Sequence, residues 1–150
     1  MIGLLQRVSR ASVSVAGEVV GKIDAGLLVF IGVERDDSDA QATRLLERIF
    51  SYRVFSDDAG KMNLGLTETG GGLLLVPQFT LAADTKKGAR ASFTPAAEPG
   101  EGERLFNLLC EQAARQWRDV SFGRFGADMQ VELVNDGPVT FWLHVPAKAS

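Results

Sequence analysis

The sequence predicts a mixed α/β fold in a single domain. Three observations carry this prediction: strand-like alternation of apolar and polar residues near both ends of the chain, a continuous apolar run at 27–33, and a helical apolar pattern at 38–51. The chain has 150 residues, of which 45% are hydrophobic and 23% are charged. That length and composition are typical of one ordinary globular domain with a core of its own.

The first third of the chain is predicted to contain three strands and a helix. Residues 2–9 and 12–16 alternate in hydrophobicity, so each is predicted as a strand with one buried face. The run 27–33 has no polar side chain, which indicates a strand buried on both faces. A helix is predicted over 38–51, because Ser38 is followed three residues later by a glutamine, as in a capping box, and apolar residues then recur on one helical face.

The rest of the chain is predicted from the same patterns. The expected elements are a short strand, a turn and an extended piece over 52–65, a buried strand over 70–81 that ends near Pro77, a surface loop over 82–100, a helix from about Glu101, and strands at 127–134 and 138–145.

Asp136, Gly137 and Pro138 lie between the last two expected strands. Asp-Gly is typical of a tight hairpin turn, because both residues tolerate a positive φ. Pro138 fits a strand ladder poorly, because it has no N–H to donate and is confined to the first residue, an edge or a bulge of a strand. The segment is therefore either a hairpin turn or a functional element built around Gly-Pro.

Charge and cysteine content exclude several classes of protein. Sixteen basic and nineteen acidic residues give a net charge of −3, whereas a protein that grips many phosphates usually has a basic excess. If the chain binds nucleic acid, we expect it to hold only a small part of the polymer.

A single cysteine excludes an internal disulfide framework, and no apolar run approaches the roughly 20 residues that span a bilayer. We expect a cytoplasmic protein that does not bind membranes.

Few residues have the chemistry of common active sites. The chain has one histidine, His144, and one cysteine, Cys110, whereas a metal site built from these types needs three or four ligands. A Ser-His-Asp triad would need His144, yet no Gly-x-Ser-x-Gly motif accompanies it. We expect His144 to be a strand residue with structural or surface duties and Cys110 to be a core thiol on a helix. The glycine run at 70–72 lacks the ending of a phosphate loop and is predicted to be a turn.

The loop after the second buried strand carries a specific set of polar and aromatic residues. On composition alone, a strand end and a solvated loop explain them, and a binding site at the strand end is the alternative. Three of these residues stand at the strand end and three basic residues follow: Gln78, Phe79, Thr80, Lys86, Lys87 and Arg90.

Several segments taken together resemble one known family. They are QFTLAADT (78–85) and NDGPVTFW (135–142), with the opening MIGLLQRVSRASV, YRVFSDDAGKMNL (52–64) and GRFGADMQVELV (123–134). In this order, and over nearly the whole chain, they resemble the D-aminoacyl-tRNA deacylases, formerly described as D-tyrosyl-tRNA deacylases. The family signature reads Ser-Gln-Phe-Thr, whereas this chain has Pro77 in the serine's place and so lacks that hydroxyl and the N–H of residue 77.

The resemblance implies a three-layer β/β/α single domain with mixed sheets and two main helices, paired as a homodimer. It implies that Gly137 and Pro138, joined by a cis peptide bond, enter the active site of the partner subunit. There their main-chain atoms check the chirality of the aminoacyl group. Glycine suits such a place, because a backbone without Cβ can approach a ligand closely.

The resemblance also implies the reaction, which is hydrolysis of the ester that joins a D-amino acid to the 3′ end of tRNA, without a cofactor. Backbone N–H groups around Phe79 and Thr80, with Gln78 beside them, would support the oxyanion, and the ribose 2′-hydroxyl would carry the proton. Thr80 as the nucleophile is the alternative, although no adjacent base is evident. A filter that only excludes side chains would also admit glycyl-tRNA.

The expected substrate contacts are apolar walls around the terminal adenosine and cations near its phosphates. Two other classes of function stay open, a non-catalytic module that binds the tRNA end and a structural dimer without activity. The residues expected to wall the adenosine are Phe79, Phe125 and Met129, and those expected near the phosphates are Lys86, Lys87 and Arg90.

Overall fold

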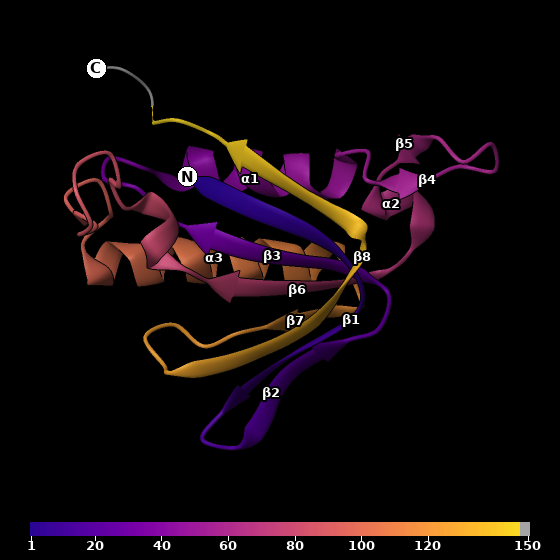
Figure 1. Ribbon diagram of the computed structural model, residues 1–150, viewed down its shortest axis with the longest axis horizontal. Coiled ribbons are helices and arrows are strands. Elements are labelled where there is room, and N and C mark those ends of the chain that lie inside the picture. The colour runs from indigo at the N-terminus through magenta and orange to yellow at the C-terminus, as the bar shows by residue number, and fades with distance from the viewer. Residues whose placement is uncertain (148–150) are drawn as a thin grey trace.

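The computed structural model describes residues 1–147, in which strands and helices are stacked in layers (Figure 1). In chain order the elements are β1 (Ile2–Val15), β2 (Glu18–Ile23), β3 (Gly26–Gly32), α1 (Asp39–Ser51), β4 (Phe55–Ser56), β5 (Met62–Leu64), α2 (Leu66–Thr69), β6 (Gly72–Pro77), the single 3-10 turn η1 (Phe79–Ala82), α3 (Pro99–Gln116), β7 (Val120–Phe122) and β8 (Met129–His144).

The main sheet combines parallel and antiparallel strands. Its order is β2-β1-β3-β6-β7, and β8 pairs with β1 outside that path. β6 runs parallel to both β3 and β7, whereas β1 is antiparallel to β2, β3 and β8. The predicted mixed α/β class is therefore confirmed.

Side chains of β3 and β6 alternate between two cores. Leu27 and Leu73 belong to the core that includes the apolar faces of α1 and α3. Leu28 and Leu74 belong to a second core, which is completed by β1, β2 and β8. Because successive strand residues point to opposite faces, one continuous apolar run can fill both cores. The three-layer β/β/α arrangement is confirmed, as is the burial of residues 27–33 on both faces.

The two main helices lie close to their predicted positions. α1 follows Ser38, whose backbone N–H donates to Gln41 Oε1 at 2.7 Å, as a capping box requires. α3 begins at Pro99, two residues before the expected start at Glu101, because proline suits the first helical position, where no N–H needs an acceptor. The short helix α2 ends at Gly70 with φ +76°, so the glycine run ends a helix and leads into β6.

The prediction of a hairpin turn between the last two expected strands is wrong. Both halves of β8 pair antiparallel with the same strand, β1, so the chain does not reverse between them (Figure 1). Val131 lies opposite Val13 before the interruption, and Phe141 lies opposite Leu5 after it. Residues 135–139 form what we call the bulge, because here β8 uses more residues than β1 does.

Other strand boundaries also differ from the expectation. The strands expected at 2–9 and 12–16 are one strand, β1, which pairs with β8 on both sides of the bulge. β4 and β5 form a small antiparallel pair within 52–65. β7 was not expected, since three residues are too few to show a period.

Among residues 1–147, no helix is long and apolar enough to cross a membrane.

Candidate active site

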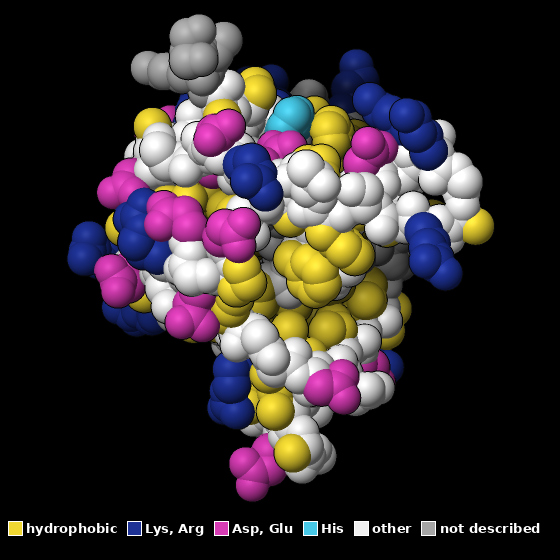
Figure 2. Space-filling model, turned by 90° about the vertical axis from the view of Figure 1, so that its left-hand side faces the viewer, with side chains coloured by type: hydrophobic (Ala, Val, Ile, Leu, Met, Phe, Trp, Pro, Cys, Tyr) yellow, Lys and Arg dark blue, Asp and Glu magenta, His cyan; other side chains and the backbone are white. Residues whose placement is uncertain are grey.

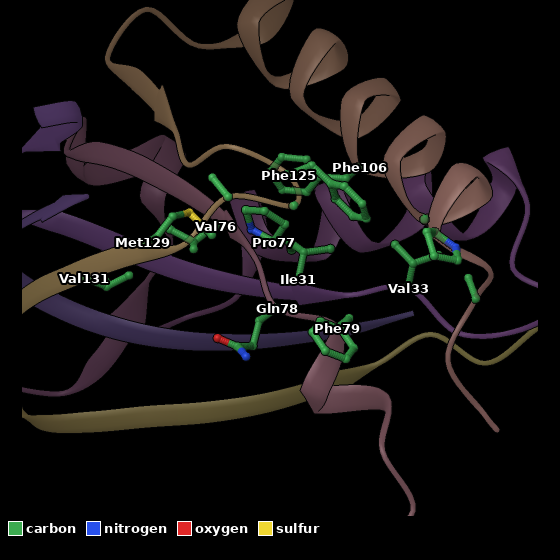
Figure 3. Close-up of a pocket in the computed structure, with 15 residues that line it drawn as sticks. Ile31, Val33, Val76, Pro77, Gln78, Phe79, Phe106, Phe125, Met129 and Val131 are labelled. Atoms are coloured by element: carbon green, nitrogen blue, oxygen red, sulfur yellow. The ribbon is translucent and has the colours of Figure 1, made fainter. Parts of the chain in front are cut away.

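A cavity of about 470 Å³ opens where β3 and β6 end. Its volume is within the usual range for a small-molecule site. Apolar side chains gather near the centre of the face that contains these strand ends (Figure 2). Figure 3 shows aromatic and aliphatic side chains around the cavity, with the Gln78 amide as the polar group at its edge.

The walls of the cavity come from several layers of the fold. Val76 and Pro77 come from β6, and Met129 comes from the start of β8 (Figure 3). Phe125, from the loop before β8, lies near Phe106 of α3 with ring centroids 6.5 Å apart. The structure therefore brings together the predicted residues Phe125 and Met129 and the strand end at Pro77.

Pro77 is the last residue of β6 and has no N–H to donate. The next residue, Gln78, donates its N–H to Ile31 O of β3 at 2.8 Å. The N atom of residue 77 faces the opposite side, where pairing with β6 continues past Phe122, because Gly123 N–H donates to Leu75 O at 2.8 Å. The departure from the family's serine therefore removes a backbone donor on the side that faces Gly123, and it makes this part of the cavity wall apolar.

The mouth of the cavity has two backbone donors. η1 begins at Phe79, and the first N–H that donates within this turn is that of Leu81, to Gln78 O at 3.2 Å. The N–H groups of Phe79 and Thr80 precede it, so they have no acceptor within the turn. Two adjacent amides of this kind can receive the negative oxygen of a tetrahedral intermediate.

The side chain of Thr80 has no base beside it. Within residues 1–147, the side chain that hydrogen-bonds to Thr80 Oγ1 is Gln78, whose Nε2 is the donor. An amide cannot take a proton from a hydroxyl, and activation of a threonine nucleophile needs a group that can. The contact instead fixes Gln78 beside the start of η1.

The bulge lies at the other end of the sheet from the cavity. Its first residue, Asn135, lies opposite Val8, which also pairs with Gly26 of β3, whereas the cavity begins beside Pro77. Gly26 pairs with Gly72, the first residue of β6, and Pro77 lies five residues further along β6. The row of paired residues that contains Asn135 is therefore about 17 Å from Pro77 along the strands. Within one chain, the predicted filter residues therefore do not meet the predicted catalytic residues.

The bulge itself is held by specific contacts. Gly137 has φ +133° and a cis bond to Pro138. Arg7 Nε donates to Asp136 O at 3.1 Å, while Arg7 Nη1 donates to Val54 O at 2.9 Å. The bulge is thus tied to β1 and to the segment before β4, and its glycine and proline remain exposed.

The predicted basic residues lie on the loop after η1. The backbones of Asp84 and Ser92 pair across this loop, with N–H to O distances of 2.8 and 2.9 Å. Lys86, Lys87 and Arg90 lie in the closed segment, are exposed, and form no ion pair among the described residues. Their charges are available to a ligand that approaches the start of η1.

His144 belongs to a polar cluster away from the cavity. Its Nε2 lies 2.6 Å from Glu34 Oε1, and the Met1 ammonium lies 3.0 Å from both Glu34 and Asp37. Burial raises the pKa of Glu34, but hydrogen bonds from the ammonium and from His144 outweigh it and leave that pKa below its usual value. For Asp37, burial prevails and raises the pKa. His144 is a strand residue with a structural contact, as predicted.

Cys110 is a core thiol on α3, also as predicted. Burial raises its pKa to about 12, so the reactive thiolate is scarce at neutral pH. Among residues 1–147, no group of three or more histidine, cysteine and acidic side chains has the geometry to hold a metal ion.

Comparison with known proteins gives the chain its family. Residues 4–144 match the model of a family described as D-Tyr-tRNA(Tyr) deacylase. The chain belongs to this family. A D-aminoacyl-tRNA deacylase of Thioalkalivibrio sulfidiphilus is 66% identical over 97% of this chain and 98% of its own.

Solved structures agree with the family fold. One described as c-Myc DNA Unwinding Element Binding Protein is 36% identical, covers 98% of this chain and 100% of its own, and superposes with a TM-score of 0.93. Another, described as a probable eukaryotic D-amino acid tRNA deacylase, is 17% identical, covers 95% and 97%, and has a TM-score of 0.80. At that identity, the second comparison supports the deacylase fold alone.

Sequence reasoning missed part of the cavity and its supports. Gly102 and Phe106 of α3 both line the cavity, and a Cβ on Gly102 would lie only 3.4 Å from Phe125 Cζ. Their spacing of four residues places them on one helical face, which is the signal that would have found them. Arg7 and Asn135, which brace the bulge, had no such signal, because the contacts that join β1 to the bulge, Arg7 with Asp136 and Asn135 with Arg7, link residues more than a hundred positions apart.

Proposed function

We propose that this chain hydrolyses D-aminoacyl-tRNA to a D-amino acid and tRNA and spares L-aminoacyl-tRNA. The observation that carries the proposal is that the N–H groups of Phe79 and Thr80, which have no acceptor within η1, lie at or next to an apolar cavity that Phe79 lines. Membership of the deacylase family supports the choice of substrate. The whole chain acts as one deacylase domain.

The reaction needs few protein groups because the substrate is an activated ester. Water attacks the ester carbonyl carbon, and the electron pair of the C=O bond moves to oxygen, where the N–H groups of Phe79 and Thr80 stabilise it. The tetrahedral species then collapses, the bond to the ribose 3′-oxygen breaks, and that oxygen takes up a proton. The ribose 2′-hydroxyl carries the proton between the water and the leaving oxygen, so no protein base is required.

The cavity binds the terminal adenosine. Phe79 and Phe125 offer rings at its mouth and wall, and Met129 offers a thioether beside them. Bases stack on aromatic side chains with about 1–3 kcal/mol per base. Lys86, Lys87 and Arg90 contact the adjacent phosphates, which suits a protein of net charge −3 that holds only the tRNA end.

The chirality filter comes from a second subunit of a homodimer. Asn135, at the start of the bulge, is about 17 Å along the strands from the cavity of its own chain, and Gly137 and Pro138 are exposed at the surface of the bulge. In a two-fold dimer each chain offers the same surfaces, so the bulge of one chain can enter the cavity of the other. Its main-chain atoms then clash with an L side chain, while a D side chain points away.

Incubation with D-tyrosyl-tRNA and L-tyrosyl-tRNA tests the proposal. We expect loss of the D ester and survival of the L ester without an added cofactor. We also propose that the protein acts in the cytoplasm, where both substrates occur. Equal loss of both esters would reject the filter. Binding of tRNA without release of amino acid would instead identify a non-catalytic module, and absence of both would leave a structural dimer.

A further inference from the structure

The bulge interrupts the ladder between β1 and β8. Gln6 pairs with Thr140 and Val8 pairs with Asn135, so Arg7 of β1 has no single partner on β8. Backbone groups on both strands therefore lack their usual ladder acceptors and donors at this point. Unpaired backbone groups are rare away from water, so another group is expected to satisfy them.

The side chain of Asn135 meets two of these groups at once. Asn135 Nδ2 donates to Arg7 O at 2.9 Å and to Val139 O at 3.0 Å, and both contacts are partly buried. One acceptor belongs to β1, and the other belongs to β8 on the far side of the bulge. Because both partners are carbonyl oxygens, which only accept, the NH₂ end of the amide must face them.

The two hydrogen bonds fix the ends of the projecting segment. Asn135 precedes Asp136, Gly137 and Pro138, and Val139 follows them. A single amide therefore clamps both ends of this segment to each other and to β1. Arg7 Nε also donates to Asp136 O, and this hydrogen bond holds the N-terminal side of the same segment.

We infer that Asn135 is the positioning residue that sets how far Gly137 and Pro138 project, and that it thereby sets the selection between D and L substrates. The inference rests on the proposed function. A filter made of main-chain atoms works by contact at van der Waals distance, and a misplacement of 1 Å is enough to change rates by about 100-fold. Asn135 acts through the bulge and does not touch the substrate.

The strand itself does not depend on this amide. Before the bulge β8 pairs with β1 from Met129 to Val134, and after it from Thr140 to His144. These two ladders hold the register of β8 when the Asn135 side chain is removed. The structure therefore separates an effect on the position of the bulge from an effect on folding.

The test compares Asn135→Ala and Asn135→Asp with wild type in the full-length protein. Asn135→Asp keeps the size of the side chain but turns an oxygen towards the two carbonyls. Asn107→Asp is the matched control, because it makes the same chemical change on the exposed side of α3. For each protein, melting temperature, oligomeric state, and hydrolysis rates on D-tyrosyl-, L-tyrosyl- and glycyl-tRNA are measured.

We expect both Asn135 variants to fold and to raise the ratio of L to D hydrolysis about tenfold or more, while the control keeps the wild-type ratio. Glycyl-tRNA hydrolysis should change little, because glycine has no side chain for the filter to exclude.

Wild-type discrimination in both folded Asn135 variants would overturn the inference. Unfolding of both would overturn it too, because it would make Asn135 a general structural residue. Absence of discrimination in the wild-type protein would instead reject the proposed function, so the two failures are distinguishable.

Discussion

Two inactive variants should restore activity when they are combined in one dimer. The first variant, Gly137→Val, puts a bulky side chain on the segment that enters the partner's cavity, where it blocks the substrate: a Cβ there would also lie 2.7 Å from Val139 Cγ2, at φ +133°, which valine rarely adopts. The second, Phe79→Pro, removes a backbone donor at the mouth of the cavity. Gln78 before it has φ −144° and ψ 83°, which lies outside the α region that a following proline disfavours.

The expected recovery follows from the separation of the two motifs in one chain. In a mixed dimer, one site combines the intact cavity of the Gly137→Val chain with the intact bulge of the Phe79→Pro chain, and the other site has both defects. Random pairing of equal amounts makes half of the dimers mixed, so about one quarter of all sites should work. Either variant refolded with wild type should keep about half of the sites by the same reasoning.

The assay is the initial rate of D-tyrosyl-tRNA hydrolysis after co-refolding, with mixed dimers verified by native mass spectrometry. The recovered sites should also spare L-tyrosyl-tRNA, because each has an unaltered cavity and an unaltered filter. If verified mixed dimers stay inactive while both variants are folded, then the bulge acts within its own chain, or it has no part in the site.

Other predictions concern single groups. Thr80→Ala should keep substantial activity, because backbone N–H groups and the substrate hydroxyl carry the reaction; a fall of roughly 10⁴-fold in kcat would indicate a nucleophile. EDTA should leave the hydrolysis rate unchanged, and full loss that one metal restores would contradict this. Glu34→Gln should lower stability to urea at pH 7, with the gap to wild type closing below about pH 4.5, because a lowered folded-state pKa contributes stability above the unfolded value and loses it as the pH falls. Cys110 should resist alkylation at pH 8 until the protein is unfolded, since burial raises the pKa of its thiol to about 12.

Local patterns in the sequence predicted the elements whose causes are local. The capping box at Ser38, the buried run 27–33 and the end of a strand at Pro77 each depend on neighbouring residues, and all three are present. The bulge depends on a distant strand. Asp136 and Gly137 carry the composition of a hairpin turn, and only pairing of both flanks with β1 decides that the chain continues straight.

The candidate site likewise contains residues that local patterns predict and residues that depend on distant contacts. Gln78, Phe79 and Thr80 were found because a buried strand ends in polar and aromatic residues, and the cavity lies beside that strand end. The clamp at Asn135 was not found, because its hydrogen-bond partner Arg7 O is 128 residues away in the sequence. Periodicity cannot show contacts of that range.

The two irregularities of the β1–β8 ladder together preserve the two-residue repeat of a β-strand. From the Ala11–Leu133 pair to the Leu5–Phe141 pair, β1 advances six residues and β8 advances eight. This net surplus of two combines three extra residues of β8 in the bulge with one extra residue of β1 between Val8 and Arg10, and Leu133 and Phe141 each pack against one of the two cores. One inserted or deleted residue would move the buried side chains at the end of β8 to the opposite face of the sheet, whereas insertion or deletion of two residues would keep them on the same face. Natural variation in the length of this segment should therefore occur in steps of two.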